Sequence, residues 1–337
     1  MKKIFNLIVS FVLIAGFSAC NKDASNNPSL PPAPVPTVNY KGLTFISSGN
    51  STVCLAKVGA PDEITLEYST DESQWNPYTI GEKISLADGT FLLFRAGEQK
   101  NLTFSKGSDS YYHFEISGPV TAQGNIMSLL DRDFSTPLST NAFFALFEGC
   151  TSLLSAPELP ATTMAQGCYF RMFAECTGLK SAPELPAKEL AYNCYGWMFK
   201  GCSALTYVPD LPATEMVSYC YNNMFANCTS LKFAPELPAT RLDMGCYHCM
   251  FEGCTSLTSA PELPATELVS NCYEFMYKDC RNLRYVIGLF TTEPSEKTTK
   301  DWLSGVAASG TFIKSKKATW DVTSADGVPE GWKIETW

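Results

Sequence analysis

The chain has 337 residues, 45% of them hydrophobic, and 25 Lys and Arg against 34 Asp and Glu give it a formal net charge of −9. The hydrophobic share is enough to bury a core, which excludes a wholly disordered protein. The negative charge argues against a nucleic-acid-binding protein, because such proteins neutralise phosphates with basic side chains. Only two histidines occur, so most metal and acid–base sites would lack their commonest residue.

Residues 1–19 are predicted to be a lipoprotein signal peptide. Two lysines precede an apolar run over residues 4–17, which is shorter than the ~20 residues needed to span a bilayer. Small residues follow the run and lead to Cys20. This ending resembles a bacterial lipobox, and the resemblance implies that Cys20 is lipidated and becomes the mature N-terminus. Ordinary cleavage that leaves Cys20 unmodified is the alternative.

Residues 20–38 are predicted to form a tether. Five prolines lie between positions 28 and 36, and prolines at this density favour extended polyproline II and build no core. The residues Asn21-Lys22-Asp23 resemble the surface-export signal of Bacteroidetes lipoproteins. The expected location is therefore the outer membrane, with a lipid anchor and exposure at the cell surface.

Residues 39–131 show an alternating pattern of apolar and polar residues. Leu43 and Phe45, or Tyr112 and Phe114, are separated by single polar residues, and Gly- and Asp-containing turn signals interrupt the runs. Short alternating segments at such intervals predict an antiparallel β-sandwich. Cys54 lies in one of these segments and is expected to be a buried thiol.

Residues 132–290 contain a 26-residue repeat. Ala-Pro-Glu-Leu-Pro-Ala recurs at 156–161, 182–187, 234–239 and 260–265, with a variant at 208–213. Two series of cysteines keep the same spacing, at positions 150, 176, 202, 228, 254 and 280 and at positions 168, 194, 220, 246 and 272. A period in this range predicts a solenoid, in which each unit covers the apolar edge of its neighbour.

The pattern within one unit predicts a helix followed by a short strand. Apolar residues at 168, 169, 172, 173 and 176 are typical of one face of a two-turn helix. In the next segment Leu153 and Ala156 would point inward from a strand that Pro157 ends. The predicted fold class is therefore α+β: an N-terminal antiparallel β-sandwich, then a solenoid with short parallel strands on one face and short helices on the other.

Residues 291–337 are predicted to be a C-terminal cap. The 26-residue register is lost, and four tryptophans occur at 302, 320, 332 and 337. An open solenoid end needs a cover, and large aromatic rings supply much area each. The alternative interpretation is an aromatic platform that binds carbohydrate.

The repeat segment Phe147-Glu148-Gly149-Cys150-Thr151-Ser152-Leu153 and its copies resemble the leucine-rich repeats of BspA-like surface proteins. The preceding β-domain is similar to the usual companion of that family. The resemblance implies adhesion or host-molecule binding at the cell surface, without catalysis.

Two columns of the repeat are candidate ligand-binding positions. Acidic residues occupy equivalent positions in five units, at Glu158, Glu184, Asp210, Glu236 and Glu262. Stacking would place them about 5 Å apart, which suggests a recognition strip for a basic partner or for a divalent ion such as Ca²⁺. A solvated or backbone-capping row is the alternative. In a neighbouring variable column, Tyr207 and Phe233 replace serine. They are either a binding hot spot or packing between units.

No catalytic or metal motif stands out. The cysteine ladders are interpreted as reduced, buried thiols, although a disulfide between the two series is not excluded by spacing. The cluster Cys246, His248, Cys249 and Cys254 could imitate a zinc site, but two of its members are ordinary repeat positions. The expected function is non-catalytic binding of a host protein, matrix component or glycan, without a cofactor or a nucleic-acid partner. The alternative is a lipoprotein that captures glycans or nutrients beside an outer-membrane uptake system.

Overall fold

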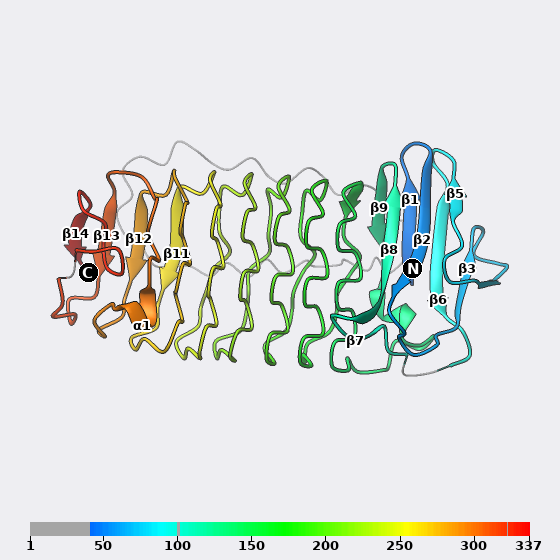
Figure 1. Ribbon diagram of the computed structural model, residues 1–337, viewed down its shortest axis with the longest axis horizontal. Coiled ribbons are helices and arrows are strands. Elements are labelled where there is room, and N and C mark those ends of the chain that lie inside the picture. The colour runs from blue at the N-terminus through cyan, green and yellow to red at the C-terminus, as the bar shows by residue number, and fades with distance from the viewer. Residues whose placement is uncertain (1–40, 100–101, 322) are drawn as a thin grey trace, which may run out of the picture. The chain divides into compact units, whose positions relative to one another are not determined.

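The computed structural model describes residues 41–99, 102–321 and 323–337. The predicted signal peptide, the predicted lipidation site Cys20 and the tether up to residue 38 lie outside the described residues. The described residues belong to one compact unit, in which the N-terminal strands are followed by a row of stacked coils (Figure 1). A single hydrophobic core extends from Leu43 to Trp332.

Two sheets of largely antiparallel strands form the N-terminal region. One has the strand order β10-β9-β1-β6-β3-β4 and the other β5-β2-β8-β7. The strands are β1 (Leu43–Ser47), β2 (Ser51–Val58), β3 (Leu66–Ser69), β4 (Asn76–Tyr78), β5 (Ile84–Leu86), β6 (Phe91–Ala96), β7 (Ser105–Gly107), β8 (Ser110–Ser117), β9 (Val120–Gln123) and β10 (Leu153–Ser155).

Aromatic rings from both sheets meet in the core between them. The ring centroid of Phe114 on β8 lies 5.0 Å from that of Phe45 on β1 and 5.6 Å from that of Phe94 on β6. These two pairings and that of Phe45 with Phe94 are edge-to-face, the arrangement that aromatic quadrupoles favour. The period-two alternation thus places one set of side chains inward from each sheet.

The repeat stack continues directly from these sheets. Strand β10 of the first coil pairs in parallel with β9, and the Phe114 N–H donates to the Leu146 carbonyl at 2.7 Å. A short 3₁₀-helix, η1 (Ile126–Leu129), lies between β9 and β10 in the chain. The Asn125 side chain caps its start by accepting from Met127 N–H at 2.8 Å. The β-region therefore pairs directly with the first coil.

The segment expected to be helical is instead a run of consecutive turns. N–H groups alternate between two partners: Met172 N–H closes a turn onto the Tyr169 carbonyl at 3.2 Å, whereas Tyr169 N–H donates to the Cys194 carbonyl of the next coil at 3.0 Å. A left-handed residue recurs every four positions, with φ of 58° at Gly167, 58° at Arg171 and 60° at Glu175. Every other backbone donor thus reaches the neighbouring coil.

The predicted helical face is therefore wrong, and with it the α+β class. An α-helix needs N–H groups bonded four residues back and a negative φ throughout, and this run has neither. The structure is 3% helix and 26% strand, arranged in several small sheets. Within the described residues, helix is confined to η1 and α1 (Glu296–Thr299).

The predicted strand of each unit is also mostly irregular. Regular strands occur at the two ends of the stack, in β10 and in a C-terminal parallel sheet, whereas the coils between them meet through single bridges such as Ser181 to Tyr207. The prolines of the repeat lack a backbone donor, which interrupts a ladder, and where a strand does include one, at Pro261, its pairing shifts register between Ser259 and Glu262. The C-terminal sheet has the order β11 (Ser259–Leu263), β12 (Tyr285–Gly288), β13 (Thr311–Lys314) and β14 (Lys333–Thr336).

The interior of the stack is built from columns of equivalent side chains. Phe173 stacks on Phe147 with centroids 5.3 Å apart and on Phe199 at 5.5 Å, and the column continues through Phe225 and Phe251 to Tyr277. Five buried tyrosines form a second column, at positions 169, 195, 221, 247 and 273. Residues 26 apart thus cover one another's apolar faces.

The last coil is closed by buried tryptophans. Trp302, Trp320 and Trp332 are at most 7% exposed, and their indole N–H groups donate to carbonyl oxygens at 2.6, 3.3 and 2.8 Å. These three rings belong to the core and do not form a surface platform, whereas Trp337 is 62% exposed. Within the described part of the chain, neither helix has the length and apolar content to cross a membrane.

Candidate functional site

The acidic row lies on the outside of the stack. Glu158, Glu184, Asp210 and Glu236 are exposed, and Glu262 is half-buried. One member also caps backbone, since the Asp210 carboxylate accepts from Glu236 N–H at 3.3 Å. Among the described residues no group of three or more His, Cys, Asp or Glu could hold a metal ion. The row therefore offers negative charge to solvent, and the structure adds nothing in favour of the Ca²⁺ alternative.

The aromatic pair of the variable column faces solvent. Tyr207 is 47% exposed and Phe233 is 59% exposed, so packing between units does not account for these rings. The pairing of Ser259 with Tyr285 puts a third ring, 40% exposed, in the same column. We call Tyr207, Phe233 and Tyr285 the aromatic column. Tyr285 was missed from the sequence, although it follows Ser259 by one repeat length.

Basic residues directly precede two members of the aromatic column. Lys232 comes before Phe233 and Arg284 before Tyr285, and Lys180 occupies the equivalent position two coils before Lys232. All three side chains are exposed. Along the chain, a cation thus precedes Phe233 and Tyr285, and an acidic residue follows Tyr207 and Phe233 after a Val-Pro or Ala-Pro dipeptide.

A shallow groove of about 470 Å³ crosses the acidic row between the first two Pro-Glu-Leu-Pro segments. Its walls are mostly apolar, formed by Ala156, Leu159 and four prolines, and the carboxylates of Glu158 and Glu184 complete its lining. Such a depression can accept apolar atoms of a partner while the carboxylates meet a cation.

The cysteines are structural. All thirteen that the structure describes are free and buried. In one series each Sγ donates to a phenylalanine carbonyl at 3.0–3.2 Å, which belongs to Phe114 of β8 for Cys150 and to the preceding coil for the others, as for Cys228 and Phe199. Burial raises the pKa of Cys150 and of Cys254 to about 12. These thiols stay protonated near neutral pH and are poor nucleophiles and poor metal ligands.

The cysteines and the histidine around His248 do not come together as a set of zinc ligands. His248 Nδ1 lies 3.1 Å from Asn222 Oδ1, and its Nε2 lies 3.5 Å from the Glu274 carboxylate and 3.8 Å from Cys249 Sγ. Cys254 instead donates to the Phe225 carbonyl at 3.1 Å. Burial lowers the pKa of His248, and the neighbouring Glu274 and Glu252 oppose that shift only in part.

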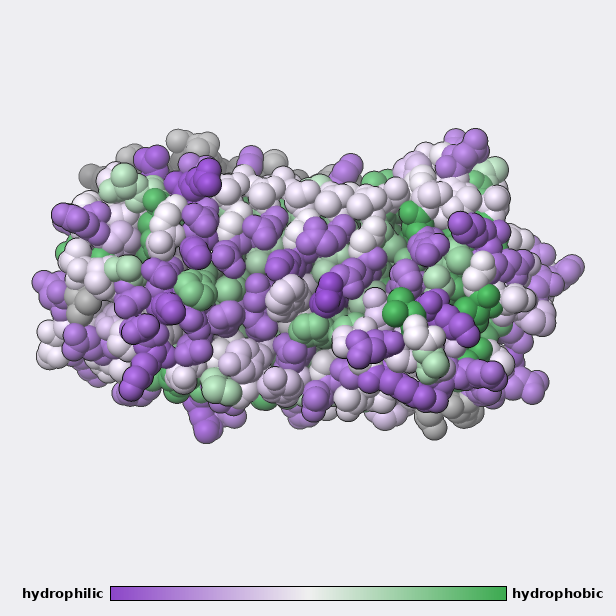
Figure 2. All heavy atoms as spheres, in the orientation of Figure 1, coloured by the Kyte–Doolittle hydropathy of each residue, from purple (hydrophilic) through white to green (hydrophobic). Residues whose placement is uncertain are grey.

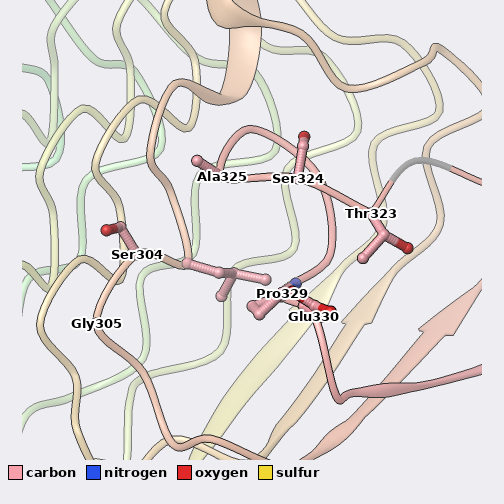
Figure 3. A pocket seen from close by; sticks show the side chains of 8 residues that line it. Ser304, Gly305, Thr323, Ser324, Ala325, Pro329 and Glu330 are labelled. Carbon is pink, nitrogen blue, oxygen red and sulfur yellow. The ribbon is translucent and has the colours of Figure 1, made fainter.

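A larger hollow of about 530 Å³ lies beside the last coil, where the loop at 323–325 and Pro329-Glu330 face Ser304 and Gly305 (Figure 3). The Ser324 hydroxyl is already used within the loop, because its Oγ accepts from the N–H groups of Asp326 and Gly327 at 3.2 and 3.1 Å. This arrangement holds the loop together.

On the face drawn in Figure 2, hydrophilic residues cover most of the surface and hydrophobic ones occur in small separate groups. The features that could bind a partner are therefore local: the aromatic column, the acidic row and the groove between the first coils. A comparison of the chain with protein-family models, curated proteins and solved structures finds no match.

Proposed function

We propose that this protein is a non-catalytic, lipid-anchored surface protein of the BspA-like kind that binds a basic segment of a host or matrix protein along its aromatic column. The proposal of a surface location rests on the lipobox-like end at Cys20 and the polar residues that follow it. The proposal of a binding role rests on the outer face of the stack.

The observation that carries the proposal is the exposure of Tyr207 and Phe233. The equivalent position is Ser155, Ser181 or Ser259 in other coils, so the coil does not need a ring there. Exposing an aromatic ring gains no folding energy, whereas aromatic side chains dominate the binding energy of protein interfaces. Two such rings on neighbouring coils, 47% and 59% exposed, are suited to anchor a partner.

The acidic row supports a basic partner. Two of its carboxylates, at Asp210 and Glu236, lie three positions along the chain from Tyr207 and Phe233. Rim charges of this kind act mainly on the rate of association and on its salt dependence. A partner that places apolar side chains on the rings and Lys or Arg against the row would match both features.

The test uses the chain from residue 21 onward, which contains the whole compact unit, on an array of extracellular-matrix and serum proteins. The double variant Tyr207→Ser and Phe233→Ser introduces the residue that other coils carry. We expect it to weaken binding at least about tenfold, since two anchors of ~1 kcal/mol or more are lost. The control is Val58→Ser on β2, another exposed apolar position, 37% exposed.

A charge arm replaces Glu184, Asp210 and Glu236 by their amides and measures association at two salt concentrations. We expect slower association and a smaller salt dependence. Binding that is unchanged in both the aromatic and the charge variants would overturn the proposal.

The second candidate function is capture of a glycan or nutrient beside an outer-membrane transporter. What favours it is a separate hollow on the turn side of the first coils, whose lining combines aromatic rings with side-chain amides.

A further inference from the structure

A small hollow of about 210 Å³ lies where the β7–β8 hairpin approaches the first coils. It is separate from the aromatic column, since its residues come from the run of turns and not from the Ala-Pro segments. Its lining side chains are aromatic rings, amides and the hydroxyl of Ser108, and six of them matter here: Phe144, Phe170, Tyr192, Asn141, Gln166 and Asn193.

The aromatic part of the hollow is held rigidly. Phe144 stacks on Phe170 with centroids 5.5 Å apart and an interplanar angle of 20°. Tyr192 is 46% exposed, and its ring is fixed edge-on against Tyr219 at 6.1 Å. Tyr192 thus presents ring surface to solvent while it packs against a neighbouring ring, which lowers the entropic cost of binding.

The amides come from three successive coils. Asn141 and Asn193 both have left-handed backbones, with φ of 56° and 57°. The backbone groups around them are used within the stack: Asn141 N–H donates to the Gln166 carbonyl at 2.8 Å, and Gly167 N–H to the Tyr192 carbonyl at 3.0 Å. Asn193 Oδ1 is buried and has no hydrogen-bond partner, so the lining of the hollow contains an unsatisfied acceptor.

Glycine at position 167 keeps the hollow open. Its φ is +58°, and a Cβ there would lie 2.3 Å from Asn141 Oδ1. A side chain would therefore displace the amide as well as fill space. None of the lining residues is charged, so the hollow offers hydrogen bonds and apolar surface without an ion pair.

We infer that this hollow binds a single neutral sugar ring. The apolar C–H face of a pyranose packs on an aromatic ring, and its hydroxyls both donate and accept, as side-chain amides do. The volume suits one ring, because pockets for drug-sized ligands begin at about 300 Å³. The uncharged lining favours a neutral sugar over an acidic one. The source is either a free sugar or the terminal residue of a glycan.

The test titrates the chain from residue 21 onward with a panel of free neutral hexoses and N-acetylhexosamines, read by ligand-observed NMR, and applies it to an array of neutral glycans. Tyr192→Ala and Gln166→Ala should each weaken binding at least about tenfold, since each removes a principal contact at an exposed position. The control is Met244→Ala, which occupies the equivalent position two coils beyond Tyr192 and is 42% exposed.

Binding to the free sugars identifies a soluble ligand, whereas binding on the array alone identifies a glycan end. No binding to either set, or binding that persists in both pocket variants, overturns the inference. Equal loss in Met244→Ala also overturns it. The double variant Tyr207→Ser and Phe233→Ser should leave sugar binding unchanged, so this inference and the proposed protein-binding role fail independently.

Discussion

The N-terminal sheets and the coil stack satisfy the hydrogen-bonding groups of their backbones in different ways. In the sheets, extended strands exchange hydrogen bonds along continuous ladders, as β2 and β8 do from Thr52 to Val58. In the stack, alternate N–H groups close turns and the others reach the next coil 25 residues away, as Phe199 does to Met224. The first solution needs extended residues, whereas the second needs a left-handed residue every four positions.

Because of this difference, the two regions tolerate different residue types. A strand is weakened by glycine, which has no side chain to pack and loses more conformational freedom on folding. The turn run favours glycine or asparagine at its left-handed positions, because other residues pay a steric cost there. Four predictions test whether the two regions behave as differently as their backbones suggest.

The largest expected effect is the loss of a ring from the middle of the stack. Phe199 is fully buried, with Phe173 at 5.5 Å and Phe225 at 5.7 Å, so Phe199→Ala should cost about 3–5 kcal/mol of unfolding free energy. Coils interact mainly with their neighbours, so we also expect urea unfolding to split into two transitions. Phe94→Ala in β6 should cost a similar amount with one transition, and Phe233→Ala less than ~0.5 kcal/mol. A cost below ~1 kcal/mol for Phe199→Ala would contradict the central role of this column.

The next effect concerns the thiol bonds between coils. Cys228→Ala removes the donor 3.2 Å from the buried Phe199 carbonyl and should cost about 1–3 kcal/mol. Cys228→Ser keeps a donor and should cost less than the alanine variant. Cys54→Ala in β2, whose backbone is already paired with β8, should cost less than Cys228→Ala in the same denaturation experiment. Equal losses for the two alanine variants would show that the sulfur–carbonyl contact contributes nothing.

A smaller effect should have opposite signs in the two regions. Glu175 is exposed and left-handed with φ of 60°, where other coils have Gly149, Gly201 or Gly253. Glu175→Gly should therefore raise stability by about 0.5–1 kcal/mol. Lys57→Gly, at an exposed position of β2, should lower it by about the same amount. The melting temperatures of both variants test this, and destabilisation in both would refute the difference.

The smallest effect is a pH dependence from His248. Its pKa is lowered in the folded chain by burial, so it stays neutral while the unfolded chain takes up a proton below pH ~6.5. Stability should fall as the pH drops through that value, and His248→Asn should lose this component. The matched control is His113→Asn on β8. If the melting temperature of His248→Asn follows the same pH curve as the parent protein, the histidine makes no contribution.

The stacking of the coils could be predicted from the sequence because identical residues recur at a fixed spacing. The 26-residue spacing of Phe147, Phe173 and Phe199 shows which residues are equivalent, and in the structure these rings stack on each other. The backbone was misread because residues 168, 172 and 176 lie on one side of either a helix or a turn run. The turn run repeats every four residues, which is close to the ~3.6 residues per turn of an α-helix, and only the left-handed positions distinguish the two structures. Gly or Asn at 167, 193, 245 and 271 was the signal that could have revealed them.

The candidate sites divide in the same way. Tyr207 and Phe233 could be identified because a variable column in a repeat reports freedom from packing. The hollow beside Tyr192 could not be found from spacing, since the β7–β8 hairpin and three coils line it together. Its chemistry depends on how the turns of neighbouring coils are positioned, which no motif in the chain records.

The fixed separation between bonded residues has a genetic consequence. Because a coil bonds to partners 25 or 26 residues away, deleting or duplicating one whole unit joins positions that are already equivalent. Any other length misaligns every later contact. Recombination between its own repeats can therefore change the reach of this protein one unit at a time and transfer an exposed ring from one copy to another, an evolutionary freedom that the strands of the N-terminal region do not have.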